Sequence, residues 1–237
     1  GRARVPHGGG PFFRGQLPSY GLMGRGASTA PRDPKNEPSS SRRRRATPPR
    51  RATPTTVPAA VAEEALAAGA AIVNDVSGLR ADSRMPEVCK RRGCGIVVMH
   101  MQGQPETMQD DPQYDFAPVD IYQFLEGRIE AAMTAGIARS QIAVDPGFGF
   151  GKTVAHNLQI LNWLSIFHGL GVPILFGASR KSTIAKLSKG EPADQRLAGS
   201  LALAMAAYRQ GAQILRVHDV AETVQALAVE QAVLKAG

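Results

Sequence analysis

Hydrophobic and polar positions alternate in a regular way from Val57 to the end of the 237-residue chain. Short apolar runs are separated by stretches with apolar residues at helical spacing. Parallel sheets covered by helices produce this pattern, because their strands are buried on both faces. The predicted strands are Ala71–Asp75, Ile96–Met101, Ile142–Asp145, Ile174–Gly177 and Ile214–His218. The predicted helices are Ala60–Ala68, Arg84–Arg92, Val119–Ala135, Asn157–Phe167, Gln195–Gln210 and Ala221–Ala236. The alternation predicts an α/β protein of βα units, in a barrel or a doubly wound sheet.

The net charge of +8 belongs to the start of the chain. Residues 1–57 hold 12 of the 28 basic residues, 2 of the 20 acidic ones and 9 of the 17 prolines, and they show no helical or strand period. The other 180 residues carry 16 basic and 18 acidic groups. We therefore expect a disordered basic segment over 1–57 and a near-neutral folded domain over 58–237. A solvated tail, an organelle transit peptide and a nucleic-acid contact through residues 42–51 stay open for the basic segment.

Cysteine content and hydropathy restrict the class of protein. Cys89 and Cys94 are too few for a disulfide framework, and no His pair lies near them at zinc-ligand spacing. No apolar run reaches the roughly 18 residues that a membrane helix needs. The sequence therefore predicts a cytoplasmic protein with no membrane span.

Polar or charged side chains occur at the end of every predicted strand or directly after it. The residues at these strand ends are Asn74 and Asp75, Met99 to Gln102, Asp145, Ser179 to Ser182, and Arg216 with His218. Because the carboxyl ends of parallel strands meet at one rim, we expect these groups to form one site.

The residue types indicate what this site binds. Arg216 and His218 are two positions apart, so on an extended strand they face the same side and suit an anion such as a phosphate. Asp145 can accept two parallel hydrogen bonds from the N–H and NH2 edge of a heterocycle, and Asn74 offers a donor and an acceptor to the same edge. Lys181 adds a positive charge and Ser182 a hydroxyl.

The loop from Asp145 to Thr153, DPGFGFGKT, is not a nucleotide-binding P-loop, because Pro146 stands where the first Gly must be. Its glycines are interpreted as allowing the backbone to approach a flat ligand, with Phe148 and Phe150 as walls.

Five motifs in order carry a family resemblance. They are VNDVSG (73–78), VVMHMQGQPETMQ (97–109), DPGFGFGKT (145–153), GASRKS (177–182) and RVHDV (216–220). From about Pro58 onward the chain closely resembles the dihydropteroate synthases. The resemblance implies a (β/α)8 TIM barrel, of which about five βα units are readable here. It also implies a transferase that joins dihydropterin pyrophosphate to 4-aminobenzoate with Mg2+ assistance, is a homodimer and is a target of sulfonamides.

The resemblance also implies roles for single residues. For the pterin these are Asn74, Met99, Asp145 and Lys181; for the aminobenzoate, Phe150, Ser182 and Thr29; for the pyrophosphate, Arg216 and His218. Lys181, Arg216 and His218 would carry catalysis, by neutralising charge on the leaving pyrophosphate.

The family motifs that should precede residue 58 are missing. The first-strand Asn that serves the metal is absent, so no metal ligand is assigned. The second-strand motif survives only as GRGASTAP (24–31), with Ala30 at the Arg position, and TPTT (53–56) replaces the third-strand Asp-Thr. A frameshifted reading of a GC-rich gene, a fragment and a divergent leader are the competing explanations. Five βα units cannot close an eight-stranded barrel, so the chain as written is expected to be poorly soluble or inactive.

Two other classes of protein compete with this interpretation. A methyltetrahydrofolate-dependent methyltransferase shares the barrel and the pterin site but has no need for the Arg216 and His218 pair. A nucleic-acid-binding protein would use residues 42–51, yet no aromatic residues are interleaved with those charges, and no nucleic-acid partner is expected.

Overall fold

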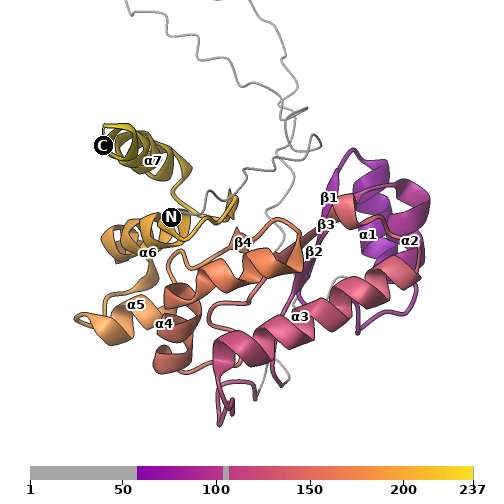
Figure 1. The fold of residues 1–237 in the computed structure, drawn as a ribbon, viewed down its shortest axis with the longest axis horizontal. Coiled ribbons are helices and arrows are strands. Elements are labelled where there is room, and N and C mark those ends of the chain that lie inside the picture. Colours follow the sequence, from indigo (N-terminus) through magenta and orange to yellow (C-terminus); the bar gives the residue numbers. More distant parts are fainter. Residues whose placement is uncertain (1–57, 104–106, 237) are drawn as a thin grey trace, which may run out of the picture. The chain divides into compact units, whose positions relative to one another are not determined.

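All strands of the folded unit run parallel and follow one another in chain order. The computed structural model describes residues 58–103 and 107–236 (Figure 1). The chain divides into two units, Gly1–Ala52 and Thr53–Gly237, and the described residues all belong to the second. The predictions for residues 1–57, including those for Thr29 and for residues 42–51, lie outside the described residues.

Helices and strands alternate as predicted. The strands are β1 (Ile72–Asp75), β2 (Gly95–Met99), β3 (Ile142–Asp145), β4 (Leu175–Phe176) and β5 (Ile214–Leu215). The α-helices are α1 (Ala59–Ala67), α2 (Met85–Arg92), α3 (Ala117–Thr134), α4 (Val154–Asn162), α5 (Ser182–Leu187), α6 (Leu197–Arg209) and α7 (Val220–Lys235). Short 3-10 helices are η2 (Arg139–Gln141), η3 (Leu164–Leu170) and η4 (Ala193–Gln195).

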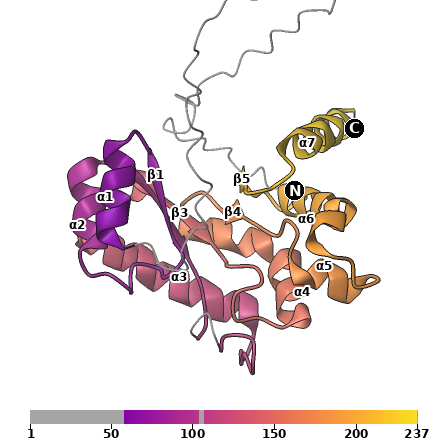
Figure 2. The same ribbon diagram turned by 180° about the vertical axis from the view of Figure 1, so that it is seen from behind.

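The strand order distinguishes the two architectures that the sequence left open. β1 pairs with β2 and β2 with β3, while β4 pairs with β5, and a parallel bridge between Val144 and Ile174 joins β3 to β4. A doubly wound sheet reverses its order at a switch point, whereas a barrel continues in one direction. The order β1 to β5 is therefore that of part of a singly wound (β/α)8 barrel. In Figure 1, α1 and α2 lie at one end of this unit and α6 and α7 at the other, and Figure 2 shows β4 and β5 from behind.

Side chains alternate between two faces of the strands. One face packs against the helices in the main hydrophobic core and includes Val73, Ile96, Val98, Ile142, Val144 and Phe176. The other face forms a separate small cluster of Val97, Ala143, Leu175 and Ile214. Such a second cluster is the inner layer of side chains that fills a barrel. Asn74, Met99 and Asp145, which are predicted to contact the pterin, have the same orientation on their strands as this inner cluster.

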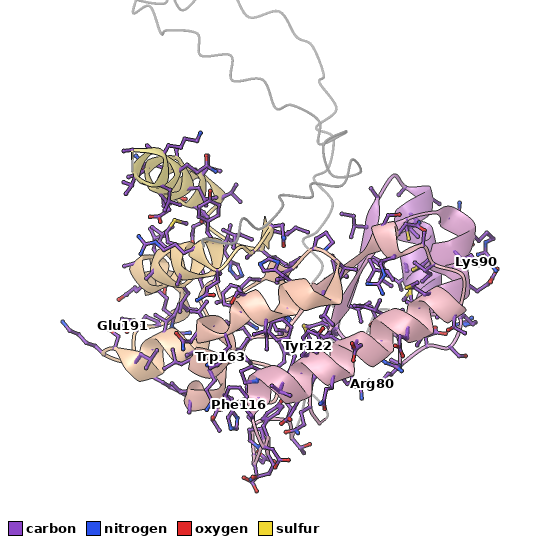
Figure 3. The ribbon with its side chains drawn as sticks, in the orientation of Figure 1. Arg80, Lys90, Phe116, Tyr122, Trp163 and Glu191 are labelled. Carbon is purple, nitrogen blue, oxygen red and sulfur yellow. The ribbon has the colours of Figure 1, made fainter. Side chains whose placement is uncertain are left out.

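Helix α3 shows why the helices cover the outer face. Ile121, Leu125 and Ile129 recur at every fourth position and are almost completely buried. The ring of Phe116 at the start of α3 packs edge to face on Trp163 after α4, with 5.5 Å between the centroids (Figure 3). These contacts hold α3 and α4 side by side.

Several predicted boundaries are wrong. The second strand ends at Met99 rather than Met101, and the fifth at Leu215 rather than His218. Helix α4 begins three residues before the predicted Asn157, because the Thr153 hydroxyl caps it by accepting a hydrogen bond from the His156 N–H at 3.2 Å. The six-residue helix α5 was not predicted. No helix among the described residues is both long and apolar enough to cross a membrane.

Candidate active site at the strand ends

Asp145 lies at the carboxyl end of β3, on the inner face and in register with Met99 of β2. Both side chains are buried. Its Oδ1 accepts a hydrogen bond from the Gly147 N–H at 2.7 Å. Burial raises the pKa of the Asp145 carboxyl, while the Gly147 N–H and the nearby positive charges of Arg216 and Lys152 act in the opposite direction. A desolvated carboxylate facing positive groups is suited to binding the polar edge of a ligand.

Asn74 and Asp75 are neighbours on β1 with opposite roles. The Asp75 carboxylate accepts three hydrogen bonds, from the Ser77 N–H at 2.8 Å, the Ser77 hydroxyl at 2.7 Å and the Leu79 N–H at 2.9 Å. The Asp75 side chain therefore stabilises the loop that directly follows β1. Asn74, on the inner face level with Val97, has a buried Oδ1 with no hydrogen-bond partner, which no other buried side-chain oxygen or nitrogen of the described residues shares. An unpaired buried amide oxygen is costly unless a ligand supplies the donor.

Arg216 lies beside the end of β4. Its N–H continues the parallel ladder by donating to the Phe176 carbonyl at 3.0 Å. Its guanidinium lies across Gly177, where an added Cβ would come within 3.2 Å of Nη2. Gly177 therefore leaves the space that the arginine occupies. This need for Gly in GASRKS was not recognised in the sequence.

Lys181 lies close to Arg216 and to the glycine-rich loop. Its Nζ is 3.9 Å from the centroid of the Phe150 ring, which is within cation–π range. Burial and the charge of Arg216 lower the pKa of Lys181, and Asp145 opposes this shift. The structure thus brings Lys181, Phe150, Arg216 and Asp145 together as predicted.

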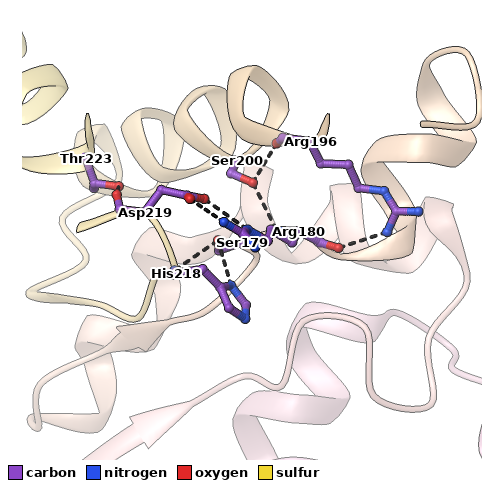
Figure 4. Close-up of polar contacts among 7 residues, drawn as sticks. All are labelled: Ser179, Arg180, Arg196, Ser200, His218, Asp219 and Thr223. Atoms are coloured by element: carbon purple, nitrogen blue, oxygen red, sulfur yellow. Dashed lines mark hydrogen bonds and ion pairs between the residues drawn. The ribbon is translucent and has the colours of Figure 1, made fainter. Parts of the chain in front are cut away.

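His218 is held by a residue that was not among the predicted ligand contacts. The Ser179 hydroxyl accepts a hydrogen bond from the His218 N–H at 3.2 Å and lies 3.0 Å from Nδ1 of the ring (Figure 4). Arg216 and His218 are exposed and Val217 between them is less so, which agrees with the predicted common face even though β5 ends at Leu215. Ser182 is exposed at the first position of α5.

The glycine-rich loop differs from its interpretation in the sequence. Phe148 is no wall of the site, because it is 1% exposed and packs edge to face on Phe176 in the main core. Gly147 has φ +70, and a Cβ there would lie 1.9 Å from the His100 carbonyl oxygen. Glycine is thus required at position 147 by the neighbouring strand end, not by a ligand.

A buried pair of His100 and Lys152 was also missed. Lys152 Nζ lies 2.9 Å from His100 Nδ1 and donates to the Phe150 carbonyl at 2.8 Å. Burial lowers the pKa of Lys152 to about 7, and burial with the nearby Lys152 charge lowers that of His100 to about 2. The pair ties the loop that carries Phe150 to the end of β2. The sequence signal was a Lys within an otherwise apolar, glycine-rich loop.

The described residues do not fit a bound divalent metal by themselves. They contain no group of three or more His, Cys, Asp or Glu side chains placed to hold one. The side chains predicted to contact the anion, Arg216, His218 and Lys181, are basic, whereas Mg2+ prefers oxygen ligands.

Comparison with known proteins identifies relatives of this arrangement. The family model described as "Pterin binding enzyme" matches residues 55–218. The dihydropteroate synthase of Escherichia coli K12 is 43% identical over 173 residues, which are 73% of this chain and 61% of that protein. The chain therefore spans about three fifths of the length of this curated relative.

Solved structures agree in fold. Dihydropteroate synthase from Thermus thermophilus, in complex with 6HMPPP, matches with a TM-score of 0.70 and 44% identity, over 74% of this chain and 69% of that one. Dihydropteroate synthase from Xanthomonas albilineans, in complex with 7,8-dihydropteroate, matches with a TM-score of 0.69 and 43% identity, over 74% and 64%. The five parallel strands thus correspond to part of a TIM barrel.

Proposed function

The chain belongs to the pterin-binding enzyme family, and from this premise we propose that it serves as a dihydropteroate synthase in folate biosynthesis. The reaction joins dihydropterin pyrophosphate to 4-aminobenzoate. The observation that carries the proposal is the unpartnered Oδ1 of Asn74 on the same inner face as buried Asp145. These two side chains offer acceptors to the N–H groups of a pterin.

The basic side chains of the site suit the departure of pyrophosphate. As the bond between the pterin methylene carbon and the pyrophosphate oxygen breaks, negative charge grows on the leaving group. Arg216, His218 and Lys181 would stabilise that charge. The aminobenzoate nitrogen forms the new C–N bond to the methylene carbon and gives up one proton to water. Met99 would line the pterin slot, and Phe150 and Ser182 would border the aminobenzoate, with Thr29 as a further proposed contact.

The proposed function includes no metal ligand among the described residues. The family resemblance implies Mg2+, which would share the neutralisation of the pyrophosphate, but the described side chains do not form its site. No step is therefore assigned to the metal. A homodimer remains a prediction of the same resemblance, which size-exclusion chromatography with light scattering would test.

Pyrophosphate release from the full chain tests the proposal. Both substrates are supplied with Mg2+, and binding of the pterin substrate alone is measured in parallel. We expect pterin binding, with slow or no turnover, because the five strands of the described residues do not by themselves close an eight-stranded barrel. Full turnover would refute the expected inactivity of the chain as written, whereas absence of any pterin binding would refute the proposed function.

A further inference from the structure

Arg180 has an unusual backbone conformation between the residue that holds His218 and a predicted ligand contact. It follows Ser179 and precedes Lys181, and its φ of +59 lies in the left-handed region. Leu79 is the other non-glycine residue with positive φ among the described residues. A side chain makes this conformation unfavourable, so the surroundings must hold it in place.

Helix α6 and Arg196, the residue directly before it, fix the backbone of Arg180 on both sides. The Arg180 N–H donates to the Ser200 hydroxyl at 2.9 Å, and Arg196 Nη1 donates to the Arg180 carbonyl at 2.9 Å. The Ser200 hydroxyl in turn donates to the Arg196 carbonyl at 2.7 Å. Figure 4 shows these contacts as one connected set.

The side chain of Arg180 reaches across to the start of α7. Its Nε donates to Asp219 Oδ2 at 3.1 Å, and its Nη2 donates to Asp219 Oδ1, so the contact is bidentate. The Asp219 carbonyl accepts hydrogen bonds from the N–H of Thr223 at 3.1 Å and from its hydroxyl at 2.7 Å. The segment that follows β5 is thereby tied to the segment that follows β4.

We propose that the Arg180–Asp219 pair is a clamp that positions the anion site, with His218 next to Asp219 on one side and Ser179 and Lys181 flanking Arg180 on the other. This inference rests on the proposed function. Arg180 and Asp219 are positioning residues that do not touch the substrate, because their charged groups are used by each other. The Ser179 hydroxyl bonded to His218 is the second link between the same two segments.

The affinity of the full chain for inorganic pyrophosphate distinguishes the proposed clamp from a purely electrostatic effect of Arg180 and Asp219 on the bound anion. Asp219→Asn removes a negative charge beside an anion site, which by charge alone would strengthen binding, and Arg180→Lys leaves the charge unchanged. The clamp predicts weaker binding in both variants. We expect a loss of about tenfold or more, since displacement of binding groups by about 1 Å can cost that much.

A second ion pair supplies the matched control. Arg209 of α6 contacts Glu230 of α7 in the same bidentate manner, with Nε–Oε1 at 2.5 Å and Nη2–Oε2 at 3.0 Å, but it adjoins none of the proposed site residues in the chain. Glu230→Gln removes an equivalent carboxylate and should leave pyrophosphate affinity unchanged. Thermal unfolding of every variant shows whether each one folds.

Hydrogen exchange gives a readout without ligand. The His218 N–H should lose protection in Asp219→Asn and Arg180→Lys but keep it in Glu230→Gln. Pyrophosphate affinity that is unchanged or higher in the first two variants, or equally reduced in the third, overturns the clamp. If the unaltered chain binds no pyrophosphate, the proposed function fails, and unchanged exchange at His218 in the first two variants would then overturn the clamp separately.

Discussion

Asp145 carries a cost to stability that its proposed role explains. Its pKa is raised by burial, so the folded protein keeps a proton at pH values above 3.8 where the unfolded chain has lost it. Stability therefore falls as the pH rises through the raised pKa. The neutral side chain in Asp145→Asn avoids this cost. The variant should gain stability relative to the unaltered chain, increasingly so from acid to neutral pH, as urea unfolding would measure.

Asp75→Asn is the matched comparison at the neighbouring strand end. Each Asp75 oxygen already accepts hydrogen bonds, so an NH2 group in place of one oxygen would face the Leu79 or Ser77 donors. We expect a loss of about 1–3 kcal/mol in the free energy of unfolding. Equal effects of the two substitutions would contradict the distinction between a ligand-binding and a structural aspartate.

Lys152 predicts a pH dependence of the opposite sign. The folded protein releases the Lys152 proton near pH 7, whereas the unfolded chain holds it until about 10.5. The unfolded state thus binds more protons in this window, and stability rises with pH by up to about 1.4 kcal/mol per unit. Lys152→Met should flatten this slope in urea unfolding between pH 7 and 10. An identical slope in both proteins would show that Lys152 stays charged in the fold.

The glycine-rich loop can be tested as an element. Gly147 and Gly93 both have positive φ, near +70 and +63, but only at Gly147 would a Cβ meet another atom within 4 Å. Gly93→Ala should therefore cost only the backbone strain, about 1–2 kcal/mol. Gly147→Ala should cost more than this, because the His100 carbonyl must also move. Chemical denaturation measures the free energy of unfolding of both variants. An equal loss of stability in the two would mean that the loop moves to accept the added Cβ at position 147 without cost.

Some elements could be predicted from the sequence and others could not. Strand β3 could be predicted because its first three residues, Ile142, Ala143 and Val144, are apolar, and the fourth, Asp145, is a charged residue at the strand end. Helix α5 was missed because six residues are too few for a helical period to show. The end of β5 was placed too late, since Arg216 continues the ladder by one hydrogen bond beyond Leu215, and a pattern of residues does not reveal where pairing stops.

The sequence predicted the charged side chains of the candidate site better than the residues that hold them in place. Asp145, Lys181 and Arg216 were found because charged residues directly after apolar runs are conspicuous. The roles of Gly177, Ser179 and Asp219 depend on contacts between segments about 40 residues apart, which residue spacing alone does not disclose. Phe148 was misassigned because a wall of a site and a core residue have the same sequence signature.

At the scale of the whole molecule, the described residues form five consecutive strands of a barrel with two unpaired outer edges, at β1 and β5. The proposed pterin and pyrophosphate contacts among the described residues lie at or just after these strand ends, whereas Thr29 and the family's metal ligand would come from elsewhere. We therefore expect the chain to bind the pterin substrate even where turnover is slow. We propose that the five strand ends form one site for a pterin pyrophosphate.

Calorimetric titration of the full chain with dihydropterin pyrophosphate tests this single site. The account predicts saturable one-to-one binding that weakens about tenfold or more in both Asp145→Asn and Arg216→Gln, because the two side chains hold opposite ends of one ligand. Absence of saturable binding to the unaltered chain, or an affinity in either variant that equals that of the unaltered chain, would contradict it.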